Sequence, residues 1–219
     1  MNQRLKKKKR PLPMFWLVLI GSIIGLVLVI VIQPQRESID PSHLPWNAHF
    51  EPSGKLTALG LTINQSTLAD AMALYGKDVE VKLFSDLDER NKSIEAYFPV
   101  IYIGSIKSAL ALKLDLTDDE LDAAYELGKK ITVTTAGGRE IELYHAEVAK
   151  LLNKKFTSVT LVPRNHLTER AIKMRFGEPD RKEVQSDGLP HWFFDKLGLE
   201  MIIDEEGPEA LQYTDIKPI

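Results

Sequence analysis

The chain has 219 residues, of which 44% are hydrophobic, and a formal net charge of −3 at neutral pH. This length accommodates one ordinary domain, or two small ones that share a core. The absence of cysteine excludes disulfides, thiolate metal sites and thiol nucleophiles. Residues 1–13 carry six Lys and Arg side chains and no acid, so removing this +6 leaves the rest of the chain at about −9. An acidic domain repels phosphate groups, and we therefore expect no nucleic-acid partner.

An uncharged stretch follows the basic tail. Residues 14–32, MFWLVLIGSIIGLVLVIVI, form a run of nineteen residues without a charge. As a helix this run would be about 28 Å long, close to the hydrocarbon thickness of roughly 30 Å. It is longer than the apolar core of a cleaved signal peptide and ends without a small-residue cleavage pattern. The sequence therefore predicts an uncleaved transmembrane helix over residues 14–32, with the lipid bilayer as its partner.

The charges that flank this helix predict its orientation. Six cations precede it, whereas Arg36 after it is accompanied by Glu37 and Asp40. The positive-inside rule then places residues 1–13 in the cytoplasm and the folded part across the membrane. Within the helix, Gly21 and Gly25 match the G-x-x-x-G pattern, through which two membrane helices pack closely into a homodimer. The alternative is that small residues are simply common in membrane helices.

Residues 33–58 contain four prolines and many polar side chains. Because proline interrupts helices, we expect an extended tether between the membrane and the folded domain. Two histidines in this segment, His43 and His49, are expected to be solvated rather than to bind a ligand. Trp46 is expected to pack against the membrane surface or the domain.

Residues 59–116 predict one helix followed by three strands. A capping hydroxyl and a carboxylate, in Ser66-Thr67 and Asp70, open the helix, and Gly76 ends it. Leucines at every second position from Leu110 to Leu116 indicate the buried face of a strand. The three strands are expected over residues 79–85, 93–98 and 106–116.

Residues 117–160 predict a helix, a hairpin, a second short helix and a strand. Thr117 and Glu120 form a T-x-x-E capping box before a helix that ends at Gly128. The acidic residues of this box favour a helix start over a cation site, because acids in a first turn satisfy free amides. Gly137-Gly138 indicates the hairpin turn. Strands are expected over residues 130–135, 139–144 and 157–162, and the second helix is expected over residues 145–153.

Residues 161–219 repeat the plan of residues 59–116. A helix begins at Leu167-Thr168 and ends at Gly177, and a three-stranded meander follows over residues 191–194, 197–204 and 210–213. A shift of 101 positions superposes three residue pairs: Thr67 on Thr168, Tyr75 on Phe176 and Gly76 on Gly177. We therefore predict an α+β fold in which two helix-plus-antiparallel-meander units, residues 59–116 and 161–219, flank an insert at residues 117–160.

The C-terminal unit also resembles a known family. Leu167-Thr168, Phe176-Gly177-Glu178-Pro179 and Trp192-Phe193, within residues 162–213, match the L-T…G-x-P…W-x pattern of SmpA/OmlA (BamE-like) domains and resemble the repeats of β-lactamase-inhibitor-type proteins. The resemblance implies helix-plus-meander modules that bind other proteins. It also implies a periplasmic domain anchored in the bacterial inner membrane. BamE-like proteins are lipoproteins, whereas this chain has no cysteine to acylate and carries a membrane helix instead.

The sequence contains no recognisable catalytic pattern. G-x-S-x-G does not occur, and the five histidines are isolated from one another, so neither a serine hydrolase nor a zinc site is indicated. We expect no cofactor and no metal. His191, beside Trp192 and shortly after Asp187, is the candidate functional surface. The alternative is that His191 is an edge-strand side chain next to a core tryptophan.

These features predict a non-catalytic envelope protein, anchored in the inner membrane, whose periplasmic domain binds a protein partner in assembly or scaffolding. One alternative is an envelope enzyme that acts on a glycan or peptide, which a pocket gathering carboxylates or histidines would favour. Another is a small-ligand sensor. Because residues 1–13 leave no room for an output domain, such a sensor would have to signal through a membrane partner.

Overall fold

The computed structural model describes residues 22, 40–134, 137–204 and 206–215. The predicted basic tail (residues 1–13) and nearly all of the predicted transmembrane helix (residues 14–32), with Gly21 and Gly25, lie outside this part of the chain. Among the residues that the structure does describe, no helix is both long and apolar enough to span a bilayer. The anchor, its orientation and its self-association therefore remain predictions. From Asp40 onward, the described residues belong to one compact unit.

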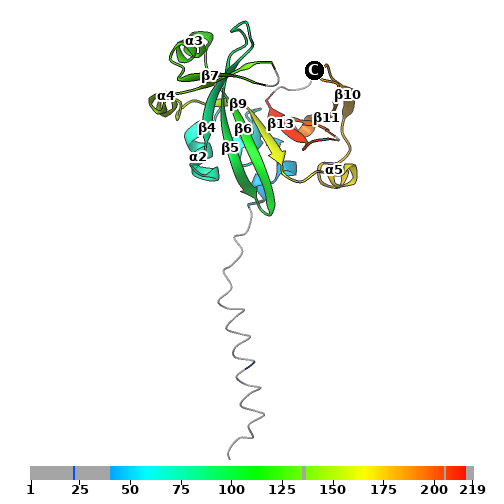
Figure 1. The fold of residues 1–219 in the computed structure, drawn as a ribbon. Coiled ribbons are helices and arrows are strands. Elements are labelled where there is room, and N and C mark those ends of the chain that lie inside the picture. The colour runs from blue at the N-terminus through cyan, green and yellow to red at the C-terminus, as the bar shows by residue number, and fades with distance from the viewer. Residues whose placement is uncertain (1–21, 23–39, 135–136, 205, 216–219) are drawn as a thin grey trace, which may run out of the picture. The chain divides into compact units, whose positions relative to one another are not determined.

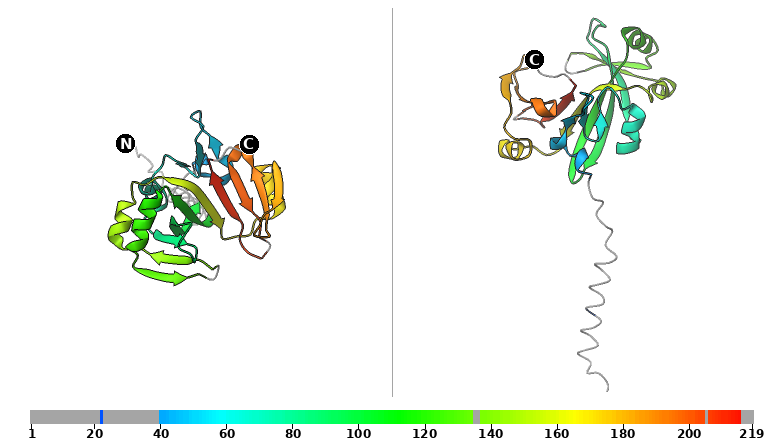
Figure 2. Two further views of the ribbon diagram at one scale, coloured as in Figure 1. Left: turned by 90° about the horizontal axis from the view of Figure 1, so that it is seen from above. Right: turned by 180° about the vertical axis from the view of Figure 1, so that it is seen from behind.

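This unit has an α+β fold, as predicted. Its described residues form four α-helices, a ten-stranded antiparallel sheet and a small three-stranded sheet (Figures 1 and 2). In spatial order the large sheet consists of β10 (Arg181–Val184), β11 (Pro190–Phe194), β12 (Leu199–Ile202), β13 (Ala210–Thr214), β9 (Phe156–Pro163), β6 (Ile106–Leu114), β5 (Ser93–Ile103), β4 (Glu80–Ser85), β8 (Arg139–Glu142) and β7 (Lys130–Val133). The other elements are α2 (Leu68–Tyr75), α3 (Asp118–Glu126), α4 (His145–Lys150), α5 (Glu169–Phe176), the small sheet β1 (His49–Phe50), β2 (Leu56–Ala58) and β3 (Leu61–Thr62), and the 3₁₀ turns η1 (Pro41–His43), η2 (Pro45–Asn47) and η3 (Asp195–Leu197).

The helices begin and end where their capping residues indicate. The Thr67 hydroxyl accepts from the Asp70 amide while the Asp70 carboxylate accepts from the Thr67 amide, and a second capping box opens α3. Thr168 caps α5 by accepting from the amide three residues on. Gly76 and Gly177 follow α2 and α5 with φ angles of +101° and +87°, which only glycine adopts easily.

The two helix-plus-meander segments share their geometry. The 101-residue shift that aligns the two helices also aligns the first residue of β4, Glu80, with that of β10, Arg181. The last aromatic residue of each helix packs on a phenylalanine of the second strand that follows. Tyr75 meets Phe98 at a ring-centroid distance of 6.4 Å, and Phe176 meets Phe194 at 5.8 Å. In the sheet, β4-β5-β6-β9 and β10-β11-β12-β13 are arranged symmetrically about the antiparallel β9–β13 pair.

Each meander therefore has four strands instead of the predicted three. The last segment gains β10, whose four residues Arg-Lys-Glu-Val are all exposed and show no alternation that would predict a strand. The first segment gains β9 as its fourth strand, which lies across the predicted boundary at residues 160/161. The insert between β6 and β9 thus consists of α3, β7, β8 and α4.

The tether prediction is wrong for residues 40–58, which fold as part of the domain. Pro41 and Pro45 each start a 3₁₀ turn instead of interrupting structure, because a fixed φ suits the first position of a helix. Leu56 is fully buried, and the Tyr213 hydroxyl donates to the Pro45 carbonyl over 2.7 Å. Apolar residues spaced between the prolines thus fill the core, and the tether prediction can hold only for residues 33–39, which lie outside the described residues.

Trp46 packs on the domain, one of the two sites expected for it. Its ring meets Phe176 edge-on at a centroid distance of 6.1 Å, and the Arg175 guanidinium lies 4.7 Å above it. The two histidines of this segment are held by the fold and are not free in a tether. The Nδ1 atom of His49 lies 3.0 Å from the Asn47 carbonyl oxygen, and the His43 ring lies against Gly60.

The large sheet has one buried and one open face. A continuous row of buried side chains crosses six strands on the first face, where α2, α5 and residues 40–63 cover it: Phe98, Leu110, Leu161, Leu211, Met201 and Trp192. The alternate residues form a row on the second face, and no described helix packs over them: Tyr97, Ala111, Thr160, Gln212, Glu200, Phe193 and Arg181. We call this second row and its neighbours the open face.

Candidate functional site

His191 lies between two carboxylates at one side of the open face. Its Nδ1 atom is 2.6 Å from Glu200 Oε1 on β12, and its Nε2 atom is 3.0 Å from Asp187 Oδ2 in the turn between β10 and β11. The side chain is only 7% exposed. The structure thus brings His191 and Asp187 together, as their spacing suggested, and adds Glu200 from the neighbouring strand.

This geometry requires a protonated ring. A neutral imidazole has one N–H and one acceptor nitrogen, whereas both nitrogens of His191 face a carboxylate oxygen and must donate. Burial by itself lowers the pKa of His191, but the hydrogen bonds to Glu200 and Asp187 outweigh burial and raise the pKa overall. A hydrogen bond from the Leu189 amide, and then the one from His191, lower the pKa of Asp187. The cluster is therefore an imidazolium between two carboxylates.

Such a cluster is suited to hold structure together and not to abstract a proton. A general base must have a nitrogen free to accept from a nucleophile, and both nitrogens of His191 are occupied. The cluster instead fastens the β10–β11 turn, through Asp187, to the centre of its meander, through Glu200.

Trp192 does not share this surface. As the next residue along β11 it points to the buried face, where it pairs in register with Met201. The Lys182 ammonium lies 3.5 Å above its ring. Trp192 is therefore a core residue, which is the structural alternative that its sequence context allowed.

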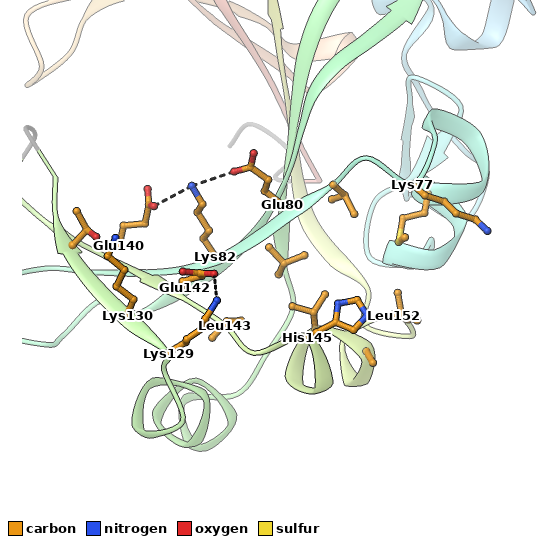
Figure 3. Close-up of a pocket in the computed structure, with 16 residues that line it drawn as sticks. Lys77, Glu80, Lys82, Lys129, Lys130, Glu140, Glu142, Leu143, His145 and Leu152 are labelled. Atoms are coloured by element: carbon orange, nitrogen blue, oxygen red, sulfur yellow. Dashed lines mark hydrogen bonds and ion pairs between the residues drawn. The ribbon is translucent and has the colours of Figure 1, made fainter.

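An open cleft lies at the other end of the sheet, next to β4 (Figure 3). It has a volume of about 750 Å³ and is bordered by β4, β7, β8, α4 and the end of α2. Four lysines, three glutamates and one histidine line it, together with Thr132 and several apolar side chains; the titratable residues are Lys77, Lys82, Lys129, Lys130, Glu80, Glu140, Glu142 and His145. An envelope enzyme was expected to show such a pocket of carboxylates and histidines. The arrangement of these side chains therefore decides whether the cleft can act as an active site.

The carboxylates of the cleft are bound in ion pairs. Lys82 lies between Glu80 and Glu140, with N···O distances of 3.2 Å and 3.0 Å, and Lys129 pairs with Glu142 at 2.6 Å (Figure 3). The hydrogen bond to Glu140 raises the pKa of Lys82, and the bond between Lys129 and Glu142 raises the pKa of the lysine and lowers that of the glutamate. These shifts lead away from neutral pH, where an acid–base catalyst has to titrate.

His145 does not join these charged groups. It begins α4 and lies beside Leu143 and Leu152, away from the Lys82 ion pairs (Figure 3). Across the described part of the chain, no set of three His, Asp or Glu side chains is arranged to hold a metal ion. The cleft thus combines apolar side chains with three carboxylates that are all bound to lysines.

The open face itself was not foreseen as a site. Strand alternation indicates which residues point outward, but only the register places Tyr97, Thr160 and Phe193 in one row across the sheet. The outward positions of the three central strands, β6, β9 and β13, hold two charged residues, Lys107 and Lys113, both on β6; the others are Ala109, Ala111, Ser158, Thr160, Val162, Ala210, Gln212 and Thr214. This face and the cleft are the two candidate sites of the domain. No family model, no curated protein and no solved structure matches the chain.

Proposed function

We propose that this is a non-catalytic protein, anchored in the bacterial inner membrane, whose periplasmic domain binds a protein partner through the open face of its sheet. The observation that carries the proposal is the composition of that face. Solvent-facing positions of a sheet ordinarily hold many charged residues, whereas the centre of a protein interface is depleted of charge. With Lys107 and Lys113 as the two charged residues at ten outward positions of β6, β9 and β13, and no acid among them, the open face has the composition of an interface.

Aromatic residues flank this acid-free centre. Tyr97 lies on β5 to one side, and Phe193 lies on β11 to the other, with the Arg181 guanidinium 3.9 Å above its ring. Tyr, Phe and Arg are the residue types that contribute most to protein interfaces. A partner seated on Ala111, Thr160 and Gln212 would meet an aromatic side chain at each border, which favours a folded protein surface over a small molecule.

The symmetry of the sheet supports the predicted duplication. Two helices of equal length, each with a threonine cap and a terminal glycine, precede two four-stranded meanders of the same order. We infer that the segments are repeats of one helix-plus-meander module, as in the SmpA/OmlA and β-lactamase-inhibitor-type domains that the sequence resembles. Such modules bind other proteins, which agrees with a role in assembly or scaffolding.

The enzyme alternative has less support. Its best location is the cleft beside β4, but Glu80, Glu140 and Glu142 are all engaged by lysines there. His191 is likewise engaged on both nitrogens. Neither place presents an unpaired acid and base to a common point, which hydrolysis of a glycan or peptide requires.

Charge placed at the centre of the open face tests the proposal. The Thr160→Arg variant of the full chain, cross-linked in its native membranes and captured, should lose a specific cross-linked partner by about tenfold, because a buried unpaired charge is costly at an interface. Glu126→Arg, on the exposed end of α3, is the matched control and should capture the partner as the wild type does. A partner captured equally by both variants would place the interface elsewhere, and thermal unfolding of both verifies their fold.

A further inference from the structure

The end of the sheet at which β5 turns into β6 exposes apolar side chains. A β-bulge between Phe98 and Ile101 shifts the alternation, so that Ile101 is buried while Val100 and Tyr102 are 42% and 64% exposed. Lys107 is the cross-strand neighbour of Tyr102. Val100 and Tyr102 thus form an exposed apolar pair at the hairpin tip, next to a lysine.

A second cation is fixed beside this tip. The Arg164 amide donates to the Lys107 carbonyl over 2.9 Å, and the Arg164 guanidinium donates to the Pro99 carbonyl, also over 2.9 Å. These bonds hold the residue after β9 against the hairpin. We call Val100, Tyr102, Lys107 and Arg164 the tip surface.

The tip surface lies in a part of the domain that is free of acid in sequence. Residues 96–114 and 148–168, which include the β5–β6 turn and all of β9, contain no Asp or Glu, although the chain has 31 in total. The Glu209 carboxylate, which approaches from the turn before β13, is fully buried, accepts from the Leu167 amide and pairs with His166. The tip surface itself thus carries two cations, Lys107 and Arg164, and no carboxylate.

The chain enters the domain at this same end. The first described residues lie at the end of the domain where the β5–β6 hairpin turns, as both side views show (Figures 1 and 2). Packing agrees with this placement, since the His43 ring lies near Leu74 in the last turn of α2, and the next residue, Tyr75, packs on Phe98 of β5.

The distance from this end to the membrane is limited by chain length. Because residues 40–58 are folded, seven residues, 33–39, separate the predicted membrane helix from Asp40. Fully extended, these eight peptide steps span at most about 28 Å. If the anchor spans the bilayer as proposed above, the end of the domain that holds the tip surface cannot lie far from the lipid headgroups.

We propose that the tip surface docks on the anionic surface of the bilayer that holds the anchor. Tyr102 and Val100 enter the headgroup region, where an aromatic ring with a polar end is favoured, and Lys107 and Arg164 meet lipid phosphates. Tethering makes the contact intramolecular, so a few residues suffice. The strands then stand on the membrane, and the open face is presented sideways to a partner instead of facing the lipid. This inference rests on the anchorage in the proposed function.

The absence of cysteine allows a direct measurement on the full chain. Tyr102→Cys carries a polarity-sensitive fluorophore at the tip, and Asp88→Cys carries it in the β4–β5 loop, at the opposite end of β5 and 71% exposed. In vesicles rich in phosphatidylglycerol, headgroup spin-labelled lipids should quench the label at position 102 at least about twofold more than the label at 88, which lies roughly 35 Å further along the strand. Equal quenching at both positions overturns the docking.

Charge and anchorage are tested separately. Adding Lys107→Glu to the labelled Tyr102→Cys chain should reduce the quenching in anionic vesicles, whereas adding Lys130→Glu on the edge strand β7 should not.

A label that is shielded from water but not quenched by lipid shows a protein or a second copy on the tip, and overturns the lipid as occupant. Extraction at alkaline pH then distinguishes the two proposals. Release of the chain refutes the anchor, and retention with a solvent-exposed label at 102 refutes the docking alone.

Discussion

The imidazolium of His191 is a buried positive charge, and its contribution to the stability of the fold depends on pH. Its neighbours from every adjoining element are acidic or neutral. Glu200 and Asp187 bind its nitrogens, the Phe193 ring lies 6.5 Å away, and Glu183 is its cross-strand partner on β10, itself paired with Arg181. Because the folded pKa is raised, the stabilisation is complete below the ordinary pKa of about 6.5 and is lost as the pH rises through the folded pKa.

We therefore predict that His191→Gln lowers the free energy of unfolding by about 1–3 kcal/mol in mildly acidic solution, because two carboxylates lose a charged partner. The difference from the wild type should shrink as the pH rises above the folded pKa of His191. Denaturant unfolding of both proteins at a series of pH values measures this difference in the free energy of unfolding. His145→Gln, at an exposed position on α4, is the control and should show no such dependence. A constant difference at every pH would mean that folding does not shift the pKa of His191.

Residues whose role is local were predictable, and residues whose role depends on register were not. Thr67, Thr117 and Thr168 cap helices through contacts three residues away, so the sequence predicted each of them. Asp187 and His191 are four residues apart, and the sequence placed both in one candidate surface without predicting their ion pair. Glu200 joins them only because β11 and β12 pair in one particular register, which a one-residue slip would change.

Among the elements, those with a clear period were predicted and those without were missed. The alternation in β6 and the capping boxes of α2 and α3 indicated these elements almost to the residue. The edge strand β10 was missed, because all of its side chains are exposed and it is a strand only through pairing with β11.

The segment of residues 40–58 was missed for a different reason. Its prolines were taken as breaks, although Pro41 and Pro45 begin 3₁₀ turns, and its contacts are distant in sequence. The bond from Tyr213 to Pro45 joins residues 168 positions apart, which no local pattern reveals.

The role of this segment in the core can be tested with two glycines. Gly198 and Gly188 both have positive φ angles, +55° and +82°, so replacement by alanine strains the backbone at both. A Cβ at Gly198 would also come within 2.5 Å of Leu56 Cδ2 and 2.9 Å of the Thr214 carbonyl oxygen, whereas one at Gly188 would meet nothing within 4 Å. We predict that Gly198→Ala costs about 1–3 kcal/mol more than Gly188→Ala, because the packed Leu56 and the Thr214 carbonyl must move.

Denaturant unfolding of the two glycine variants measures this difference. Equal costs would show that residues 40–58 are not seated in the core, and the tether would then be long again. The outcome also bears on the membrane docking of the tip surface, because that docking relies on a tether of only seven residues.

At the scale of the whole molecule, orientation decides which partner and which leaflet the domain can meet. A periplasmic partner for the open face requires residues 1–13 to stay in the cytoplasm, whereas the tip surface requires only the leaflet on the side of the domain. The six cations of that tail provide the physical reason, since translocating them is unfavourable, while Arg36 on the other side is balanced by Glu37.

We predict that a reporter fused after Ile219 is active when it is one that works only in the periplasm, and silent when it works only in the cytoplasm. Neutralising the cluster from Lys6 to Lys9 should move a measurable fraction of the chains to the inverted orientation, because the charge difference across the helix then nearly vanishes. Lys77→Gln and Lys196→Gln, which remove charges far from the helix, should leave the orientation unchanged. An active cytoplasmic reporter on the wild-type chain would place the open face and the tip surface in the cytoplasm. The protein partner of the open face would then be cytoplasmic, and the tip surface would meet the cytoplasmic leaflet.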